Sequence, residues 1–291
     1  MASQRPRIRE ITEQDLDAVG DLLTRGFVHR PRGYWMRGLQ RQAARGVPPG
    51  APRFGYLMEQ DGQVVGCLLL ICGYKTIDGA IAETCNVSSW YVDPAFRNFA
   101  ALFASMVQKR KHVTYFNITP IRPTWPILEA QGYVSYCSGL YFSLPWLSWH
   151  GATMSVERVT GGRAPVDGLS ADDAAMLRRH AEYCNLSLVC RGGGRTMPFI
   201  FLPLRKRRGI IPMPGVQLAY CPSIADFAAS AGALGRYLLL RGKPVVILDA
   251  NGALPGIPGH YSEAHGRKYF RGPHRPQLGD LTDTELAIYG L

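Results

Sequence analysis

Residues 88–107 read SSWYVDPAFRNFAALFASMV. The run SSWYV favours a β-strand, Asp93-Pro94 interrupts it, and the apolar spacing over about 97–110 predicts an amphipathic helix. A strand, a short loop and a helix N-terminus form a corner where backbone N–H groups and the helix dipole can hold an anion. Here the loop carries Phe, Asn and Ala where phosphate loops usually carry glycine. The stretch predicts an α/β architecture and leaves open whether the corner is a binding site or a packed turn.

The second half of the chain repeats this corner. PAFRNFAALF (94–103) aligns with PSIADFAASA (222–231), with the proline, the phenylalanine and two alanines in register. In each half the block follows a strand-like stretch and precedes a helix and a second strand, VTYFNIT (113–119) or VVILDAN (245–251). A repeat that keeps its internal order indicates two copies of one unit. Further pairs in the same order are ITEQDLDAV (11–19) with LSADDAAML (169–177), EAQGY (129–133) with EAHGRKY (263–269), and SGLYFSL (138–144) with ELAIYGL (285–291).

We therefore expect two α/β domains, residues 1–150 and 151–291, joined by a linker with glycine and proline near residues 150–168. Within the first copy, Thr12 is expected to cap a helix over 13–24, with Asp15 at its third position. Asp61-Gly62 is a strong signal for a hairpin turn. The remaining expected elements of this copy are strands at 6–11, 81–92, 113–119 and 133–143 and helices near 33–45, 97–110 and 123–131.

The composition is that of a globular protein, since 46% of the 291 residues are hydrophobic and 19% are charged. No apolar run approaches the roughly 18 residues of a membrane-spanning helix, and the N-terminus lacks the apolar core of a secretory signal. We therefore expect a cytoplasmic protein with no membrane span. The seven cysteines show no CxxC pair and no zinc-finger spacing, so we expect free, buried thiols and no metal site.

The net charge of +11 indicates an anionic partner, either nucleic acid, a phosphorylated cofactor or an acidic substrate. The densest basic run, RKRR at 205–208, is typical of a solvated turn. No nucleic-acid-binding motif accompanies the charge, which argues against a nucleic-acid partner.

The order strand, two helices, hairpin, long strand, helix, strand, helix, strand resembles that of the Gcn5-related N-acetyltransferase (GNAT) superfamily. The resemblance is clear over residues 6–147 and fainter over 165–291. LEAQGY (128–133) is similar to the family's later helix ending in Gly-aromatic, and ELAIYGL (285–291) to its closing strand. The segment before the acyl-CoA pyrophosphate loop reads V-x-P-x-aromatic-R in the family, and here it is matched by Val92, Pro94, Phe96 and Arg97.

This resemblance implies two GNAT-like units in tandem, each a mostly antiparallel mixed sheet flanked by helices. It also implies transfer of an acetyl or another acyl group from its coenzyme A thioester to an amine of a small molecule or peptide, without a metal. The second copy has Ala225-Asp226 where the first has Arg97-Asn98, so the first copy is expected to bind the coenzyme. The implied coenzyme-binding residues are Trp90, Tyr91, Val92, Arg97, Asn98, Phe99, Ala100, Ala101 and Leu102.

The loop departs from the family pattern Q/R-x-x-G-x-G/A, because Ala100 and Leu102 stand at the two glycine positions. An alanine fits where the backbone is already helical. A leucine would crowd the phosphates, so we expect Leu102 to turn into the core beside Phe99, Phe103 and Met106.

The resemblance also nominates catalytic groups. Glu83, in IAETCNV, stands in the long strand where the family often carries its general base, the alternative being a solvated residue at the strand's start. Asn117 ends the next strand and would contact the acyl group or pantetheine, the alternative being a local hydrogen bond. Leu128 occupies the position of the family's acidic tyrosine. The sequence thus predicts an acyl-CoA-dependent N-acyltransferase, with a catalytically degenerate ligand-binding or interaction protein as the alternative.

Overall fold

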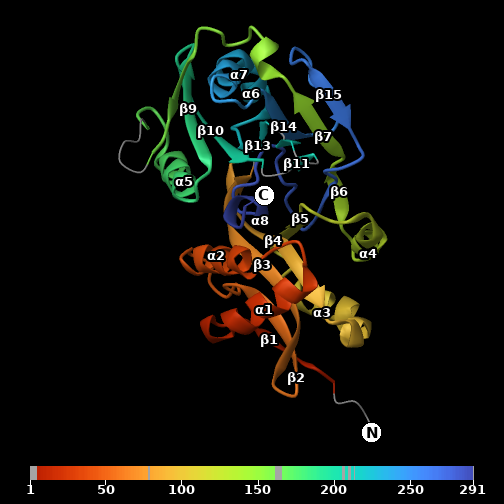
Figure 1. Ribbon diagram of the computed structural model, residues 1–291. Coiled ribbons are helices and arrows are strands. Elements are labelled where there is room, and N and C mark those ends of the chain that lie inside the picture. Colours follow the sequence, from red (N-terminus) through yellow and green to blue (C-terminus); the bar gives the residue numbers. More distant parts are fainter. Residues whose placement is uncertain are drawn as a thin grey trace. The chain divides into compact units, whose positions relative to one another are not determined.

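A computed structural model describes residues 5–77, 79–160, 166–204, 207–208, 211–212 and 214–290. The chain divides into two compact units (Figure 1). The first contains residues 1–136, 268–276 and 283–290, and the second contains residues 137–267, 277–282 and 291. The predicted boundary at residue 150 therefore falls inside the second unit, and two C-terminal segments belong to the first.

The first unit is built on a sheet whose described strands run in the order β1-β2-β3-β4-β5-β16-β6. The pairs β1–β2, β2–β3, β3–β4 and β5–β16 are antiparallel, and β4–β5 is parallel. The strands are β1 (Arg7–Glu10), β2 (Gly55–Gln60), β3 (Gln63–Ile77), β4 (Ala80–Val92), β5 (Thr114–Asn117), β6 (Val134–Cys137) and β16 (Lys268–Arg271). The helices are η1 (Glu13–Asp15), α1 (Leu16–Gly26), α2 (Arg32–Ala43), η2 (Pro94–Phe99), α3 (Ala100–Val107), η3 (Arg122–Thr124), α4 (Trp125–Ala130) and α8 (Glu285–Ile288).

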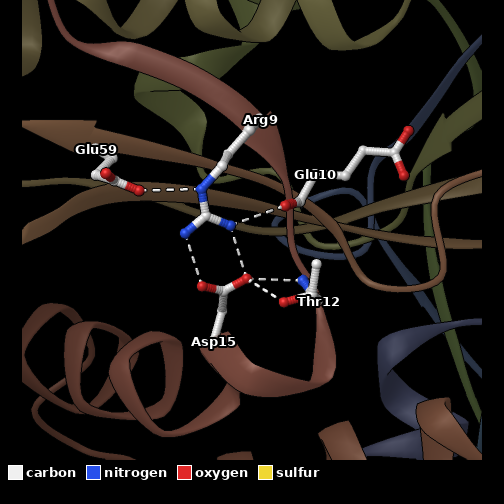
Figure 2. Close-up of polar contacts among 5 residues, drawn as sticks. All are labelled: Arg9, Glu10, Thr12, Asp15 and Glu59. Carbon is white, nitrogen blue, oxygen red and sulfur yellow. Dashed lines mark hydrogen bonds and ion pairs between the residues drawn. The ribbon is translucent and has the colours of Figure 1, made fainter. Parts of the chain in front are cut away.

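Local sequence signals account for the start of this unit. The carboxylate of Asp15 accepts hydrogen bonds from the backbone N–H and the hydroxyl of Thr12, at 2.8 and 2.7 Å, which confirms the predicted cap. The same carboxylate accepts two bonds from the Arg9 guanidinium, which also donates to Glu59 (Figure 2). This network fastens the helix start to β1 and β2. The hairpin turn at Asp61-Gly62 is also confirmed, since both residues have positive φ.

Both faces of the long strand β3 are covered. Leu68 and Leu70 point into a core that also contains Phe103 of α3. Leu69 and Ile71 alternate with them and are also buried, and α1 packs against this strand. Figure 1 shows α1 and α2 on one side of the sheet and α3 on the other.

The two sheets each take one strand from outside their own half of the sequence. The predicted strand 133–143 is two strands, of which β6 belongs to the first sheet and β7 (Gly139–Ser143) to the second. β16 enters the first sheet between β5 and β6. The expected closing strand at 285–291 is wrong, because Glu285–Ile288 form helix α8 in the first unit. The segment 263–269 has no helix corresponding to α4.

The second unit has the strand order β15-β7-β14-β13-β10-β9-β8, again mostly antiparallel with a parallel pair, β13–β14. Its core contains apolar side chains of the central strands and of α7. Arg205 and Lys206 of the predicted basic turn lie outside the described residues. The other elements are η4 (Pro145–Leu147), β8 (Ser155–Arg158), α5 (Ala171–Glu182), β9 (Leu186–Gly192), β10 (Arg195–Pro203), β11 (Arg207–Arg208), β12 (Ile211–Pro212), β13 (Gly215–Tyr220), α6 (Ile224–Ala229), α7 (Ala231–Leu239), β14 (Val245–Ala250) and β15 (Gly259–Ser262).

The predicted repeat corresponds to real structural equivalence at its centre. Each unit has a parallel strand pair connected through a helical segment, which begins at Pro94 in the first unit and two residues after the aligned Pro222 in the second. The fold is therefore two mixed α/β units in tandem, as the repeat indicated.

The cysteines differ from expectation at one pair. Cys72 and Cys85 form a disulfide between β3 and β4, whereas Cys67, Cys137, Cys184, Cys190 and Cys221 are free. The hairpin register places Cys72 directly opposite Cys85. The prediction that all seven thiols are free is therefore wrong at these two positions.

Candidate functional site

The two parallel strands of the first unit separate part of the way along their length. β4 pairs with β5 from Thr84–Thr114 to Asn86–Phe116, and the register ends there. On its other side β4 remains paired with β3, with a bulge that places Ser88 and Ser89 opposite a single residue of β3. A bulge bends its strand and increases its twist. The C-terminal half of β4 therefore turns its second edge away from β5, and no described strand pairs with that edge past Asn86.

The corresponding edge in the second unit is already occupied. The register of β13 with β14 ends at Gln217–Ile247. Beyond that point the chain's own residues 279–281 lie along β13: Leu281 N–H donates to the carbonyl of Ala219 at 2.7 Å, and Cys221 N–H donates to that of Gly279 at 3.0 Å. In the second unit the chain's own backbone therefore pairs with the β13 edge that corresponds to the open edge of β4.

The C-terminal end of β4 leads into the corner formed by Asp93 and the helix η2 that follows it. Trp90 and Tyr91 are half-buried, and Val92 is buried. The Trp90 Nε1 is buried without a hydrogen-bond partner in the described part of the chain. Asp93 is held by an ion pair with Arg25 of α1, at 2.8 Å. The corner is therefore anchored on one side by α1.

Residues 94–99 form the 3-10 helix η2 and not an open loop, and the Ala100 N–H at the start of α3 donates to the carbonyl of Arg97. Arg97 and Asn98 are exposed, Phe99 and Ala100 are half-buried, and Ala101 is exposed. No ion pair involves Arg97 among the residues that the structure describes. Its charge is therefore available to an anion at this corner.

Leu102 does not turn into the core. Its exposed fraction is 53%, while the next residue, Phe103, is completely buried. Consecutive helix residues are about 100° apart, so burial of Phe103 directs Leu102 toward the surface. The expected inward position of Leu102 is wrong, and Met106 is likewise exposed.

Glu83 lies near the start of β4, and its carboxylate is paired with the side chains of Arg110 and His112. Arg110 contacts both of its carboxylate oxygens, with an Nη2–Oε2 distance of 2.8 Å, and the His112 Nε2 lies 3.4 Å from Oε2. A guanidinium that contacts both oxygens of a carboxylate forms charge-assisted hydrogen bonds and occupies lone pairs that could otherwise accept from a ligand. This arrangement makes Glu83 a structural ion-pair member in the free protein.

Asn117 also has a local partner, because its Oδ1 accepts the N–H of Thr119 at 3.2 Å. Leu128, at the position of the family's acid, is buried in the core. Burial raises the pKa values of the nearby Tyr115 and Tyr133, and the Tyr133 hydroxyl donates to Gln108.

The C-terminal helix α8 brings a second carboxylate to the end of the β4–β5 pairing. The N–H of Glu285 donates to the Asn86 Oδ1 at 3.2 Å, and its Oε1 accepts the Thr119 hydroxyl at 2.7 Å. Burial raises the pKa of Glu285 to about 7, against the hydrogen bond from Thr119 and the positive charge of Lys268. Sequence reasoning missed this residue because ELAIYGL was assigned to a strand. The Thr-Glu pair at 284–285, typical of a helix start, was the available signal.

The described residues contain neither a metal-binding cluster nor a membrane-spanning helix. No group of three or more His, Cys, Asp or Glu side chains is arranged to hold a metal ion. No described helix combines the length and the apolar character required to cross a bilayer.

No protein-family model matches the sequence, and no curated protein matches it. Solved structures do. A conserved protein from Enterococcus faecalis, described as a probable N-acyltransferase, has a TM-score of 0.59 at 12% identity, over 96% of this chain and 74% of its own. A GCN5-related N-acetyltransferase from Kribbella flavida has a TM-score of 0.59 at 14% identity, over 92% and 71%. A putative acetyltransferase from Pyrococcus horikoshii has a TM-score of 0.57 at 12% identity, over 100% and 95%. This likeness confirms the predicted fold, two GNAT units in tandem.

Proposed function

We propose that this chain, which has a tandem GNAT fold, is an acyl-CoA-dependent N-acyltransferase whose first unit binds the thioester. The observation that carries the proposal is the second edge of β4, which has no described strand partner past Asn86. The equivalent edge of β13 in the second unit is paired with residues 279–281. A pantetheine arm carries amide groups that can pair with such an edge as an added strand would. The co-substrate would be acetyl-CoA or another acyl-CoA, and the acceptor an amine of a small molecule or peptide.

The corner after β4 supports the same assignment. Trp90, Tyr91 and Val92 would line the pantetheine arm, and residues 97–102 would face the pyrophosphate. Arg97 contributes a positive charge without an ion-pair partner among the described residues. Charge-assisted bonds from arginine to phosphate oxygens are among the stronger polar contacts in proteins.

The reaction would be a direct transfer. The neutral amine nitrogen attacks the thioester carbonyl carbon, a C–N bond forms, and the C–S bond breaks with its electron pair on sulfur. The nitrogen loses a proton, and the thiolate gains one. A base is required because most amines are protonated near pH 7. Asn117, at the end of β5, is proposed to lie near the acyl group.

A second candidate is binding of an acyl-CoA without turnover. Two observations favour it. The base that the resemblance nominates, Glu83, is held in an ion pair with Arg110. The family's general-acid tyrosine is absent, because a buried leucine, Leu128, stands at its position. This candidate differs from the first in one result, the absence of product with any amine.

Calorimetric titration of the full chain with acetyl-CoA and with longer acyl-CoAs tests the proposal. Arg97→Ala should weaken binding about tenfold, the effect of losing one charge-assisted contact. Arg7→Ala is the matched control, since Arg7 is an exposed arginine on β1 of the same unit. A folded protein that binds no acyl-CoA at about millimolar concentration would refute the proposal. Binding without product across an amine panel would favour the second candidate.

A further inference from the structure

Glu285 occupies a fixed position where β4 and β5 separate. Asn86 is the last β4 residue in register with β5, and its Nδ2 donates to the Phe116 carbonyl at 3.2 Å. The Oδ1 of the same side chain accepts the Glu285 N–H. Thr119, just beyond β5, donates to the Glu285 Oε1. Contacts from both strands therefore hold this carboxyl at the branch point.

The second oxygen of this carboxyl has no hydrogen-bond partner in the described part of the chain. Glu285 is 8% exposed, and its Oε2 is buried without a hydrogen-bond partner among the described residues. Native proteins pair nearly all buried polar atoms, and the exceptions gather at places where a ligand or water completes the site. An unpaired carboxylate oxygen at the branch point suits a ligand that supplies an N–H group.

The groups around Glu285 set its proton affinity. Lys268 of β16 is buried and favours the ionised form. The phenol groups of Tyr34 on α2 and Tyr289 on α8 also interact with its charge. Hydrogen bonds from Thr119 and Asn86 also favour the ionised form, and the balance with burial leaves a pKa of about 7. A base is most effective when its pKa lies close to the working pH.

Glu83 has the opposite surroundings. Both of its oxygens contact Arg110. Among the described residues, no arginine pairs with the Glu285 carboxyl, and its Oε2 has no hydrogen-bond partner. The Glu83 carboxylate is thus committed to its ion pair with Arg110, whereas one oxygen of Glu285 is left for a ligand.

We propose that Glu285 is the general base that takes a proton from the acceptor amine, directly or through one water molecule. This inference rests on the proposed function. The ammonium group of the acceptor gives one proton to Oε2, and the neutral nitrogen then forms the C–N bond as the C–S bond breaks. The nitrogen gives a second proton to the thiolate and keeps its last one as the amide N–H, and Glu285 releases its proton to solvent. The products are an amide, free coenzyme A and one proton.

The test is the pH profile of kcat/KM with acetyl-CoA and an amine panel, for wild type, Glu285→Gln, Thr119→Val and the exposed control Glu13→Gln. For wild type, kcat/KM should fall as the pH drops below about 7, which gives the profile an acid limb. Glu285→Gln should lower kcat/KM about 100-fold or more near pH 7 and abolish this limb, while its affinity for acyl-CoA stays near that of wild type. Thr119→Val removes a bond that stabilises the ionised form and should move the limb to higher pH. Glu13→Gln should leave the profile unchanged.

The remaining outcomes distinguish an error in the role of Glu285 from an error in the proposed function. If Glu285→Gln retains the wild-type rate and the limb, the assignment of Glu285 is wrong and the proposed function stands. If wild type binds no acyl-CoA or makes no product, the proposed enzymatic function and this inference fall together. If Glu285→Gln does not fold, Glu285→Asp takes its place, with a lowered kcat and a retained limb expected. Loss of the limb only in Glu83→Gln would also overturn the inference.

Discussion

The pH dependence of stability tests the environment of Glu285 without any substrate. Burial raises the pKa of this carboxyl from 4.5 to about 7 in the folded chain. The folded state therefore binds the proton more tightly than the unfolded state does. By linkage, the stability associated with the protonated form is complete below about pH 4.5 and is lost as the pH rises through about 7.

The size of this loss follows from the two pKa values. They differ by about 2.5, and one pKa unit corresponds to about 1.4 kcal/mol, so the full loss is about 3 kcal/mol. Most of it, about 2 to 3 kcal/mol, develops between about pH 5 and pH 8.5. Glu285→Gln cannot ionise at this position, so its unfolding free energy should lack this decline. Relative to wild type, the variant should become more stable by about 2 to 3 kcal/mol over that range.

Urea unfolding of the full chain at several pH values measures the effect. The quantity of interest is the difference in unfolding free energy between Glu285→Gln and wild type, because other titrating groups cancel in it. Glu13→Gln, measured in parallel, corrects for removing one negative charge from a protein of net charge +11. A difference that stays constant to within about 0.5 kcal/mol from pH 5 to pH 8.5 would refute the reasoning, because it would mean that folding does not change the proton affinity of Glu285.

Two further predictions concern the first unit. Asp15→Asn should lower the unfolding free energy by about 2 kcal/mol near pH 7, because the carboxylate accepts two bonds from Arg9 and caps η1 at Thr12. The Arg9 guanidinium holds the pKa of Asp15 well below 3.8, so this contribution is present above about pH 4 and shrinks in stronger acid; equal losses by urea unfolding at pH 7 and pH 3 would contradict it. A thiol-reactive dye should count five thiols in the denatured, unreduced protein and seven after reduction, and seven in both would show that Cys72 and Cys85 are not joined.

The features predicted from the sequence are those with local causes. The Asp61-Gly62 turn, the Thr12 cap and the helix after β4 depend on residues that are neighbours in the chain. Because the sequence repeat showed some of the same signals twice, the tandem arrangement of two units could also be predicted. Exposure was harder to predict: the apolar spacing of the helix after β4 was recognised, yet Leu102 lies on its outer side.

The features missed depend on contacts between distant parts of the chain. β16 pairs with β5, which lies about half the sequence away, and no local pattern at Lys268–Arg271 specifies that partner. ELAIYGL is a short apolar run, which periodicity alone cannot assign to a strand or a helix. Its helix, and with it the position of Glu285, is fixed by contacts with Asn86 and Thr119. Hence the sequence nominated Glu83, a carboxylate on the expected strand, and could not nominate Glu285.

The comparison of the two corners shows how one architecture can serve stability in one copy and leave groups free in the other. In the second unit Ser223 caps α6 by accepting the Asp226 N–H, and the Asp226 carboxylate accepts the Ser223 hydroxyl and pairs with Arg195 at 2.7 Å. Its polar groups are thus used within the unit, and residues 279–281 close the adjacent strand edge. At the aligned positions of the first unit, Arg97 and Asn98 are exposed, and the β4 edge has no strand partner past Asn86 in the described chain. A purely structural corner would be expected to satisfy these groups, as the second copy does, so their availability in the first copy is the strongest physical argument for placing a ligand there.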